Sequence, residues 1–160
     1  MKNTYFSIFT SQEKENIVGF IQKDFPDAET ELKQDKFIVF KTSVEPKFFT
    51  EIGYLEKTFL LIKQFDKLKG NYFKPMFQWA GRHSFEQITE VNKHFGFKSF
   101  RIILKDKEKT ISGHRRAIKS LERKIADETR LTINRVNPDT EIWIMHTAGD
   151  YGFIIFKLAK

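Results

Sequence analysis

The chain has 160 residues, which is enough for one ordinary domain or two very small ones with a core that needs neither disulfides nor metal. It contains 18 phenylalanines and no cysteine, so a disulfide framework and a thiolate zinc site are excluded, and we expect a cytoplasmic protein. No apolar run approaches the roughly 20 residues that cross a bilayer, so we expect no membrane partner.

The net charge of +7 is concentrated in one segment of the second half. Residues 98–135 hold twelve Lys or Arg and five Asp or Glu, so the net charge of this segment equals that of the whole chain. A cationic excess on a segment that also shows strand and helix periodicity is typical of a surface that binds a polyanion. RNA or DNA is therefore the first partner to consider.

The first half has the hydrophobic pattern of a small unit that mixes strands and helices. The predicted elements are a strand over 4–9, a helix over 12–23, paired strands over 30–33 and 37–40, a helical turn over 48–52 and a strand over 58–65. This order is that of a ferredoxin-like unit.

The middle of the chain is predicted to be a connection followed by a helix. Residues 68–81 contain two glycines, an asparagine and a proline, which are typical of turns and loops. Ser84 is predicted to cap a helix over 85–95, with Gln87 completing a capping box and Gly96 ending the helix.

The last third has the clearest periodicity. A strand over 100–105 is predicted to turn its even-numbered apolar residues to the core. A helix that starts at Ser112–Gly113 is predicted to bury Ala117, Ile118, Leu121 and Ile125. The remaining predictions are a strand over 131–133, a turn over 137–140, and a hairpin of strands 141–147 and 151–158.

This order of strand, basic helix, short strand, Asn-Pro-Asp turn and closing hairpin resembles a THUMP domain, the RNA-binding module of tRNA and rRNA modification enzymes. The matching segments are 100–105, 114–125, 137–144 and 151–156. Residues 54–63 are similar to part of the ferredoxin-like domain that precedes this module in guanine-N2 RNA methyltransferases. The resemblance implies an α+β chain with a ferredoxin-like domain over 1–80 and a THUMP-like α/β domain over 81–160.

The resemblance also implies a function. Such a module binds the acceptor region of tRNA or an rRNA hairpin and positions it for a separate catalytic domain, whose cofactor would be S-adenosylmethionine. The chain contains neither a Gly-x-Gly-x-x-Gly turn nor a phosphate-loop motif, so we expect no cofactor and no catalytic residue within it. Residues 137–140 are similar to the Asn-Pro-Pro-Tyr motif of amino-methyltransferases, but they lack its second proline and its aromatic residue and are interpreted as a turn. We expect the chain to be the N-terminal part of a longer enzyme.

The candidate RNA-binding residues are basic side chains and two histidines of the second half. They are Arg82, His83, Arg101, Lys105, His114, Arg115, Arg116, Lys119, Arg123, Lys124 and Arg135. Trp79 is a weaker candidate for stacking on a base, whereas Trp143, His94 and His146 are interpreted as structural. The four histidines lack metal-ligand spacing, so no metal site is expected.

Three alternatives stay open at this level. The cations of the basic helix are also compatible with a solvated face on which Glu122 and Asp127 pair with arginines. The chain is also compatible with a self-contained enzyme for a small anionic substrate, centred on Arg82 and His83, or with an adaptor that binds an acidic protein. RNA contact through phosphates, with weak sequence preference and with selectivity from RNA shape and a free 3′ end, is the interpretation we favour.

Overall fold

The computed structural model describes residues 2–50 and 57–159. The chain forms two compact units, Met1–Leu61 with Lys157–Ala159, and Ile62–Phe156 with Lys160. This division precedes the predicted domain boundary after residue 80, and the domain limits stay a prediction. None of the helices in the described ranges is long and apolar enough to cross a bilayer.

In its described residues, the first unit is a small antiparallel sheet with one α-helix. Its elements are β1 (Asn3–Ile8), α1 (Lys14–Asp24), β2 (Glu29–Lys33), β3 (Phe37–Thr42), a 3-10 helix (Pro46–Thr50) and the beginning of β4 (Thr58–Phe65). The strand order is β2-β3-β1-β4, and every neighbouring pair is antiparallel. The predicted strands, the helix and the pairing of 30–33 with 37–40 are confirmed, and the arrangement is compatible with a ferredoxin-like unit. The predicted helical turn and the segment 54–63 lie partly outside the described residues.

Aromatic side chains fill the core of the first unit. Tyr5, Phe25, Phe40 and Phe49 are all buried, and the ring of Tyr5 lies 4.5 Å from that of Phe49 between centroids. The ring of Phe25 stacks on that of Phe40 at 6.2 Å. Offset and edge-to-face contacts of this kind stabilise a core beyond its buried area. Much of the high phenylalanine content therefore serves folding.

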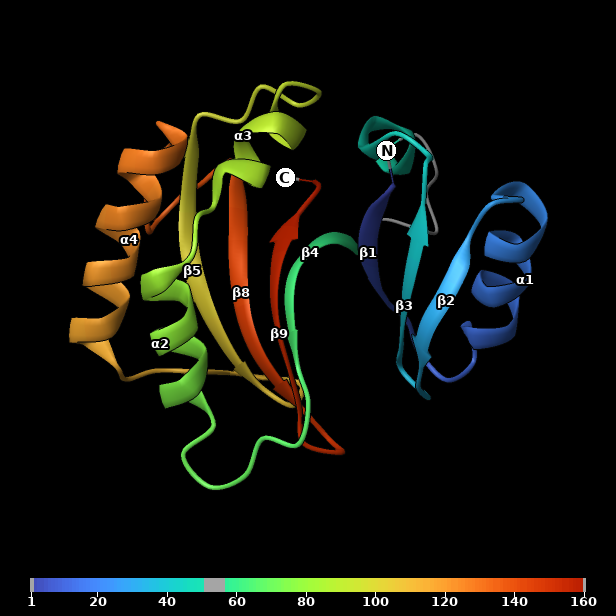
Figure 1. Ribbon diagram of the computed structural model, residues 1–160, viewed down its shortest axis with the longest axis horizontal. Helices are drawn as coiled ribbons and strands as arrows, with labels where there is room; N and C mark the ends of the chain where they lie inside the picture. The colour runs from blue at the N-terminus through green and yellow to red at the C-terminus, as the bar shows by residue number, and fades with distance from the viewer. Residues whose placement is uncertain (1, 51–56, 160) are drawn as a thin grey trace. The chain divides into compact units, whose positions relative to one another are not determined.

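The second unit is a mixed sheet with three helices. After the end of β4 come α2 (Phe73–Arg82), α3 (Glu86–Asn92), β5 (Ser99–Asp106), β6 (Lys109–Ile111), α4 (Arg115–Thr129), β7 (Thr132–Ile133), β8 (Thr140–Thr147) and β9 (Tyr151–Lys157). The strand order is β9-β8-β5-β6, with β7 also paired to β5. β5 and β8 are parallel, and β8 and β9 form the predicted hairpin. The three helices lie on one side of this sheet (Figure 1). The fold is α+β, as predicted.

Helix α2 corrects the prediction that residues 68–81 form a connection. Pro75 is the third residue of α2, where its missing amide hydrogen costs no helical hydrogen bond. Phe73, Met76 and Ala80 are buried at i, i+3 and i+7, so a helical stripe was present among the turn-forming residues.

Helix α3 begins one residue later than predicted, at Glu86. The Ser84 hydroxyl accepts a hydrogen bond from the Glu86 amide at 3.1 Å, and the N-cap residue is Phe85. The predicted capping box between Ser84 and Gln87 is therefore wrong, because Ser84 is not the N-cap residue.

Strand β6 was not predicted. It is three residues long, pairs with the end of β5 and is largely exposed, so it has no hydrophobic alternation to reveal it.

Candidate nucleic-acid interface

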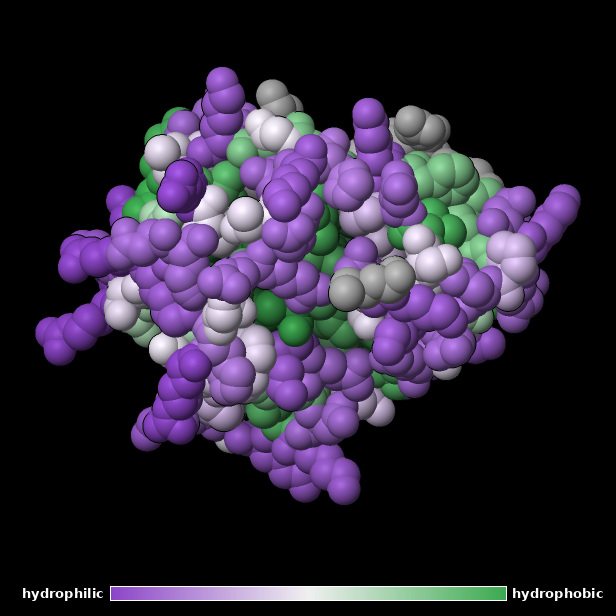
Figure 2. Space-filling model, turned by 45° about the horizontal axis from the view of Figure 1, so that its top comes forward, coloured by the Kyte–Doolittle hydropathy of each residue, from purple (hydrophilic) through white to green (hydrophobic). Residues whose placement is uncertain are grey.

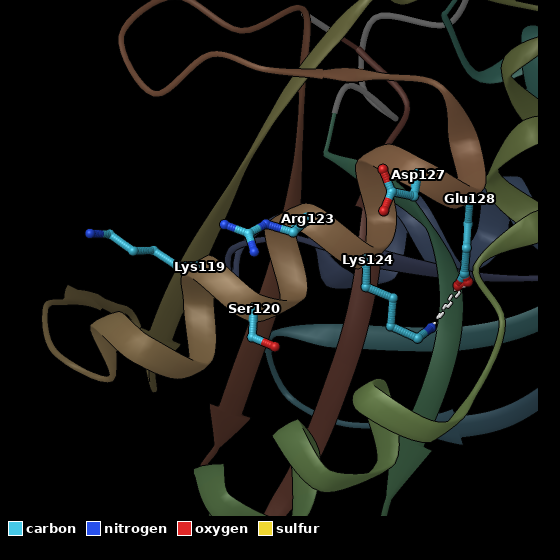
Figure 3. A pocket seen from close by; sticks show the side chains of 6 residues that line it. All are labelled: Lys119, Ser120, Arg123, Lys124, Asp127 and Glu128. Carbon is cyan, nitrogen blue, oxygen red and sulfur yellow. Dashed lines mark hydrogen bonds and ion pairs between the residues drawn. The ribbon is translucent and has the colours of Figure 1, made fainter.

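Four basic side chains stand on the exposed surface of α4. Arg115, Arg116, Lys119 and Arg123, here called the α4 cation row, are all exposed. Within the described residues, none of the four makes an ion pair. At about 1.5 Å rise per residue, Arg116 and Arg123 are about 10 Å apart along the helix. Lys119 and Arg123 extend away from the helix in the same direction (Figure 3). Their charges are available to an anion.

Helix α4 is fixed by a buried stripe that includes one charged residue. Leu121 and Ile125 are buried, as predicted, whereas Ala117 and Ile118 are half-buried. Glu122 is 2% exposed and accepts hydrogen bonds from Arg135 Nε at 3.0 Å and from its terminal nitrogen at 2.7 Å.

This pair compensates the charge of Arg135 and raises its pKa, first through the hydrogen bonds and then through the attraction to Glu122. It ties the segment after β7 to α4.

Arg101 is also bound to a carboxylate. It lies directly opposite Glu141 in the parallel β5–β8 ladder, and its Nε donates to Glu141 Oε2 at 2.6 Å. A terminal nitrogen of Arg101 donates to the Arg135 carbonyl at 3.2 Å. The neighbouring Lys105 places its Nζ 4.6 Å from the ring centroid of Trp143, in a cation–π contact. Both cations on this face of β5 thus have partners within the protein.

Lys124 links α4 to the junction between α2 and α3. Its Nζ donates to the two oxygens of Glu128 at 2.6 and 3.1 Å and also to the His83 carbonyl. It lies 4.9 Å from the ring centroid of Phe85. Figure 3 shows Lys124 turned toward Glu128, away from Lys119 and Arg123. Lys124 therefore has a structural role besides any contact with a ligand.

The α2–α3 junction carries an aromatic stack. The ring of His83 stacks on that of Trp79 with centroids 4.3 Å apart and planes 9° apart, and His83 Nδ1 lies 2.9 Å from the Trp79 carbonyl oxygen. His83 is exposed and covers one face of the ring of Trp79, which is half-buried. Arg82, the last residue of α2, is exposed beside it.

His114 precedes α4 in a left-handed backbone conformation with φ of 52°. Its ring lies 5.5 Å from that of Phe73 and 5.7 Å from that of Phe77 between centroids. It lines a groove of about 510 Å³ between α2 and α4, to which α2 contributes Lys74, Phe77 and Gln78. These α2 residues were not predicted as site residues, because their segment was interpreted as a connection. Their i, i+3, i+4 spacing was the available signal.

A second groove, of about 530 Å³, runs along α4 itself. Its lining includes Lys119, Ser120, Arg123 and Lys124, with Asp127 and Glu128 at its other end (Figure 3). Figure 2 shows that hydrophilic side chains cover most of the face drawn, with hydrophobic groups recessed between them.

His146, on β8, is buried and lies close to the carboxylates of Asp106 and Asp150. Its Nδ1 lies 3.1 Å from Asp106 Oδ1, and the ring of Tyr72 stacks on it at 3.8 Å. The Tyr72 hydroxyl donates to Asp106, which lowers the pKa of that carboxyl, with the His146 hydrogen bond as a further cause. The cluster joins α2 to the ends of β5 and β8. In the described ranges, no group of three or more His, Cys, Asp or Glu is placed to hold a metal ion.

Comparison with known proteins identifies the fold. No family model matches the chain, and no curated protein sequence matches it. TrmN from Thermus thermophilus aligns with a TM-score of 0.67 at 9% identity, over 100% of this chain and 46% of TrmN. A 4-thiouridine synthetase, solved with RNA and bound ATP, aligns at 0.54 and 13% identity over 98% and 41% of the two chains. SMU.472, a candidate methyltransferase solved with S-adenosylhomocysteine, aligns at 0.58 and 12% identity over 97% and 41%.

These likenesses concern the fold. The chain shares its fold with TrmN and with the 4-thiouridine synthetase, and this fold supports the predicted resemblance to a THUMP domain. It spans less than half the length of each of the three proteins.

Proposed function

We propose that this chain is the RNA-binding part of an RNA-modifying enzyme. The observation that carries the proposal is the α4 cation row, four exposed cations that pair with no carboxylate among the residues the structure describes, on a helix whose other side is anchored in the core. A solvated helix face is expected to pair part of its charge at i, i+4 spacing, as Lys124 and Glu128 do. A row of four cations that have no carboxylate partner in the described part of the chain is better suited to a string of phosphates.

The comparisons support RNA as the partner. One protein with this fold was solved in complex with RNA, and another was solved with the methylation product S-adenosylhomocysteine. We therefore propose structured RNA, either the acceptor region of tRNA or an rRNA hairpin, as the ligand. The reaction, base methylation with S-adenosylmethionine, belongs in this proposal to a domain outside this chain.

The proposed mechanism of this part is positioning. Phosphate contacts fix the orientation of a nucleic acid but do not read its bases. The α4 cation row would thus hold the RNA backbone in one register, and selectivity would come from RNA shape. Arg82 and His83 at the α2–α3 junction extend the candidate surface beyond α4.

Competition between folded tRNA and heparin tests the proposal. We expect the protein to prefer tRNA at equal charge concentration, and we expect the combined variant Arg116→Glu, Lys119→Glu and Arg123→Glu to lose this binding while staying folded. A matched control reverses three exposed lysines elsewhere, Lys23, Lys33 and Lys69, with the same change in net charge.

Equal binding of heparin and tRNA, or equal loss in the two variants, would contradict the proposal. If the chain binds an acidic protein more tightly than RNA, it is an adaptor instead. Turnover of a small anion without RNA, abolished by changing Arg82 or His83, would identify an enzyme.

A further inference from the structure

A buried histidine lies where three connections of the second unit meet. His146, near the end of β8, is 6% exposed, and its carbonyl accepts a hydrogen bond from the Lys107 amide in the β5–β6 turn. In the β8–β9 turn, the Asp150 carbonyl accepts a hydrogen bond from the Leu68 amide, which belongs to the connection between β4 and α2. The β4–α2 connection and the β8–β9 turn lie at the same end of the sheet (Figure 1). His146 therefore lies where α2 is attached to the strands.

The connections around His146 contain disfavoured backbone conformations. Lys67, Lys107 and Asp150 have φ angles of 57°, 58° and 61°, although none of them is glycine. A left-handed conformation at such a residue persists only where the surrounding structure enforces it. We therefore expect the attachment of these connections to depend on the contacts that surround His146.

The imidazole ring of His146 lies between two carboxylates. Its Nδ1 is 3.1 Å from Asp106 Oδ1, and its Nε2 is 3.5 Å from Asp150 Oδ1. Each neighbouring element brings its own group to this ring. These groups are Asp106 at the end of β5 with Lys107 beside it, Asp150 in the β8–β9 turn, the Tyr72 ring stacked at 3.8 Å before α2, and on β9 the uncharged Gly152 opposite His146.

Only one nitrogen of the His146 ring can form its hydrogen bond when the ring is neutral. The Tyr72 hydroxyl donates to Asp106 and is the first cause of the lowered pKa of that carboxyl, which therefore acts as an acceptor. His146 Nδ1 must then carry a proton to bond with Asp106, and this leaves a lone pair on Nε2. That lone pair faces the carboxylate of Asp150, which cannot donate to it.

A second proton on the ring would satisfy the other nitrogen. In the described part of the chain, His146 Nε2 is a buried atom without a hydrogen-bond partner. Once protonated, Nε2 can donate to Asp150 in a charge-assisted hydrogen bond, and the cationic ring also gains from the π face of Tyr72. Both gains offset the cost of placing a charge in a buried position.

We propose that protonation of His146 closes a latch between β8, the β8–β9 turn and the start of α2. In this His146 latch, the ring donates from Nδ1 to Asp106 and from Nε2 to Asp150, and Asp150 holds the β4–α2 connection through Leu68. Because the bonded form is the charged one, the added stability is present at the acid end of the interval in which histidines titrate, about pH 5–8, and is lost as pH rises.

This inference goes beyond the proposed function, because it concerns the chain without any ligand. Helix α2 forms one wall of the groove between α2 and α4. The His146 latch therefore sets how firmly that wall is held to the sheet, and it makes this attachment depend on pH.

Hydrogen exchange of the free chain at about pH 5.5 and about pH 8 tests the His146 latch. We expect the protection factor of the Leu68 amide to fall about 10-fold from the lower to the higher pH, which is the effect of one hydrogen bond to a charged group. The Thr132 amide, which donates to the Lys98 carbonyl outside this cluster, should keep its protection. Nitrogen NMR of the histidine rings should show His146 Nε2 losing its proton over the same interval.

A variant at Asp150 separates the latch from other effects of pH. Asp150→Asn keeps the size of the side chain, and asparagine tolerates the left-handed backbone at this position. Its amide can donate to the neutral Nε2, so this variant should hold the connection at both pH values and lose the difference in Leu68 protection. Asp127→Asn removes an exposed carboxylate of α4 instead and should keep the difference.

Two results would overturn the inference. One is equal protection of the wild-type Leu68 amide at both pH values, and the other is an undiminished difference in Asp150→Asn. Neither result bears on the proposed function, since the experiment contains no RNA.

Discussion

Replacing Arg116, Lys119 and Arg123 together by glutamine removes three cations from the exposed face of α4 that make no ion pair within residues 2–50 and 57–159. Each phosphate contact contributes about 0.7 (single strand) to 0.9 (duplex) to the slope of log K against log salt concentration. Loss of three contacts should therefore reduce the magnitude of that slope by about 2.1–2.7, so that the wild type loses about 20- to 40-fold more affinity than the variant between about 50 and 200 mM salt.

The matched comparison replaces three cations that already have carboxylate partners. Arg101, Lys124 and Arg135 are bonded to Glu141, Glu128 and Glu122. Because these charges are compensated within the protein, the second triple glutamine variant should change the slope by less than half as much as the first. It should instead lower the free energy of unfolding, since Glu122 is buried and would lose its partner.

Fluorescence anisotropy with labelled tRNA over a salt titration measures the slope, and urea unfolding of the free protein measures stability. The second triple variant could reduce the slope of log K against log salt concentration as much as the first. In that case, the presence of a carboxylate partner does not distinguish structural cations from RNA-binding cations. An unchanged slope in the first variant would show that RNA does not contact α4.

Three further predictions concern stability. Gly152→Ala should lower the free energy of unfolding by about 1–3 kcal/mol in urea titrations, because its Cβ would lie 2.8 Å from Met76 Sδ in the core; equal stability would show that the core repacks freely. Ile125→Ala, at a fully buried position of α4, should cost about 2–5 kcal/mol, and RNA affinity should fall only with the folded fraction.

The third prediction concerns Asp27 and the loss of protein stability in acid. Hydrogen bonds, from Ser43 first, lower its pKa from 3.8 to about 2, so its contribution to stability is present above about pH 4 and lost as pH falls toward 2. Asp27→Asn should weaken the loss of stability over that interval, measured by unfolding at a series of pH values, and an identical pH dependence would contradict the assignment.

The parts of the fold that could be predicted are those with a simple period. The strand over 4–9 and the hairpin of β8 and β9 follow from alternation, and the buried positions Leu121 and Ile125 follow from the helical period. Helix α2 could not be predicted from residue types, because its proline and glycine are the same residues that form loops. The helix can form because of where the proline stands, since Pro75 lies in the first turn.

The candidate site could be predicted only as a set of charges. Local spacing placed Arg116, Lys119 and Arg123 on one exposed face, and the structure agrees. The ion pairs of these cations could not be predicted. Arg101 and Glu141 are forty residues apart in sequence, and only the register of the parallel strands β5 and β8 brings them together. Arg135 likewise reaches Glu122 only through the fold after β7. A count of charges along the chain cannot distinguish compensated from available cations.

The most direct measurement is an NMR titration of the isotope-labelled chain with tRNA, which reports the contact surface residue by residue. We expect the backbone amides of 114–124 and the side chains of the α4 cation row to show the largest shift changes. Changes confined to α1 and β2 in the first unit, with α4 unaffected, would contradict it.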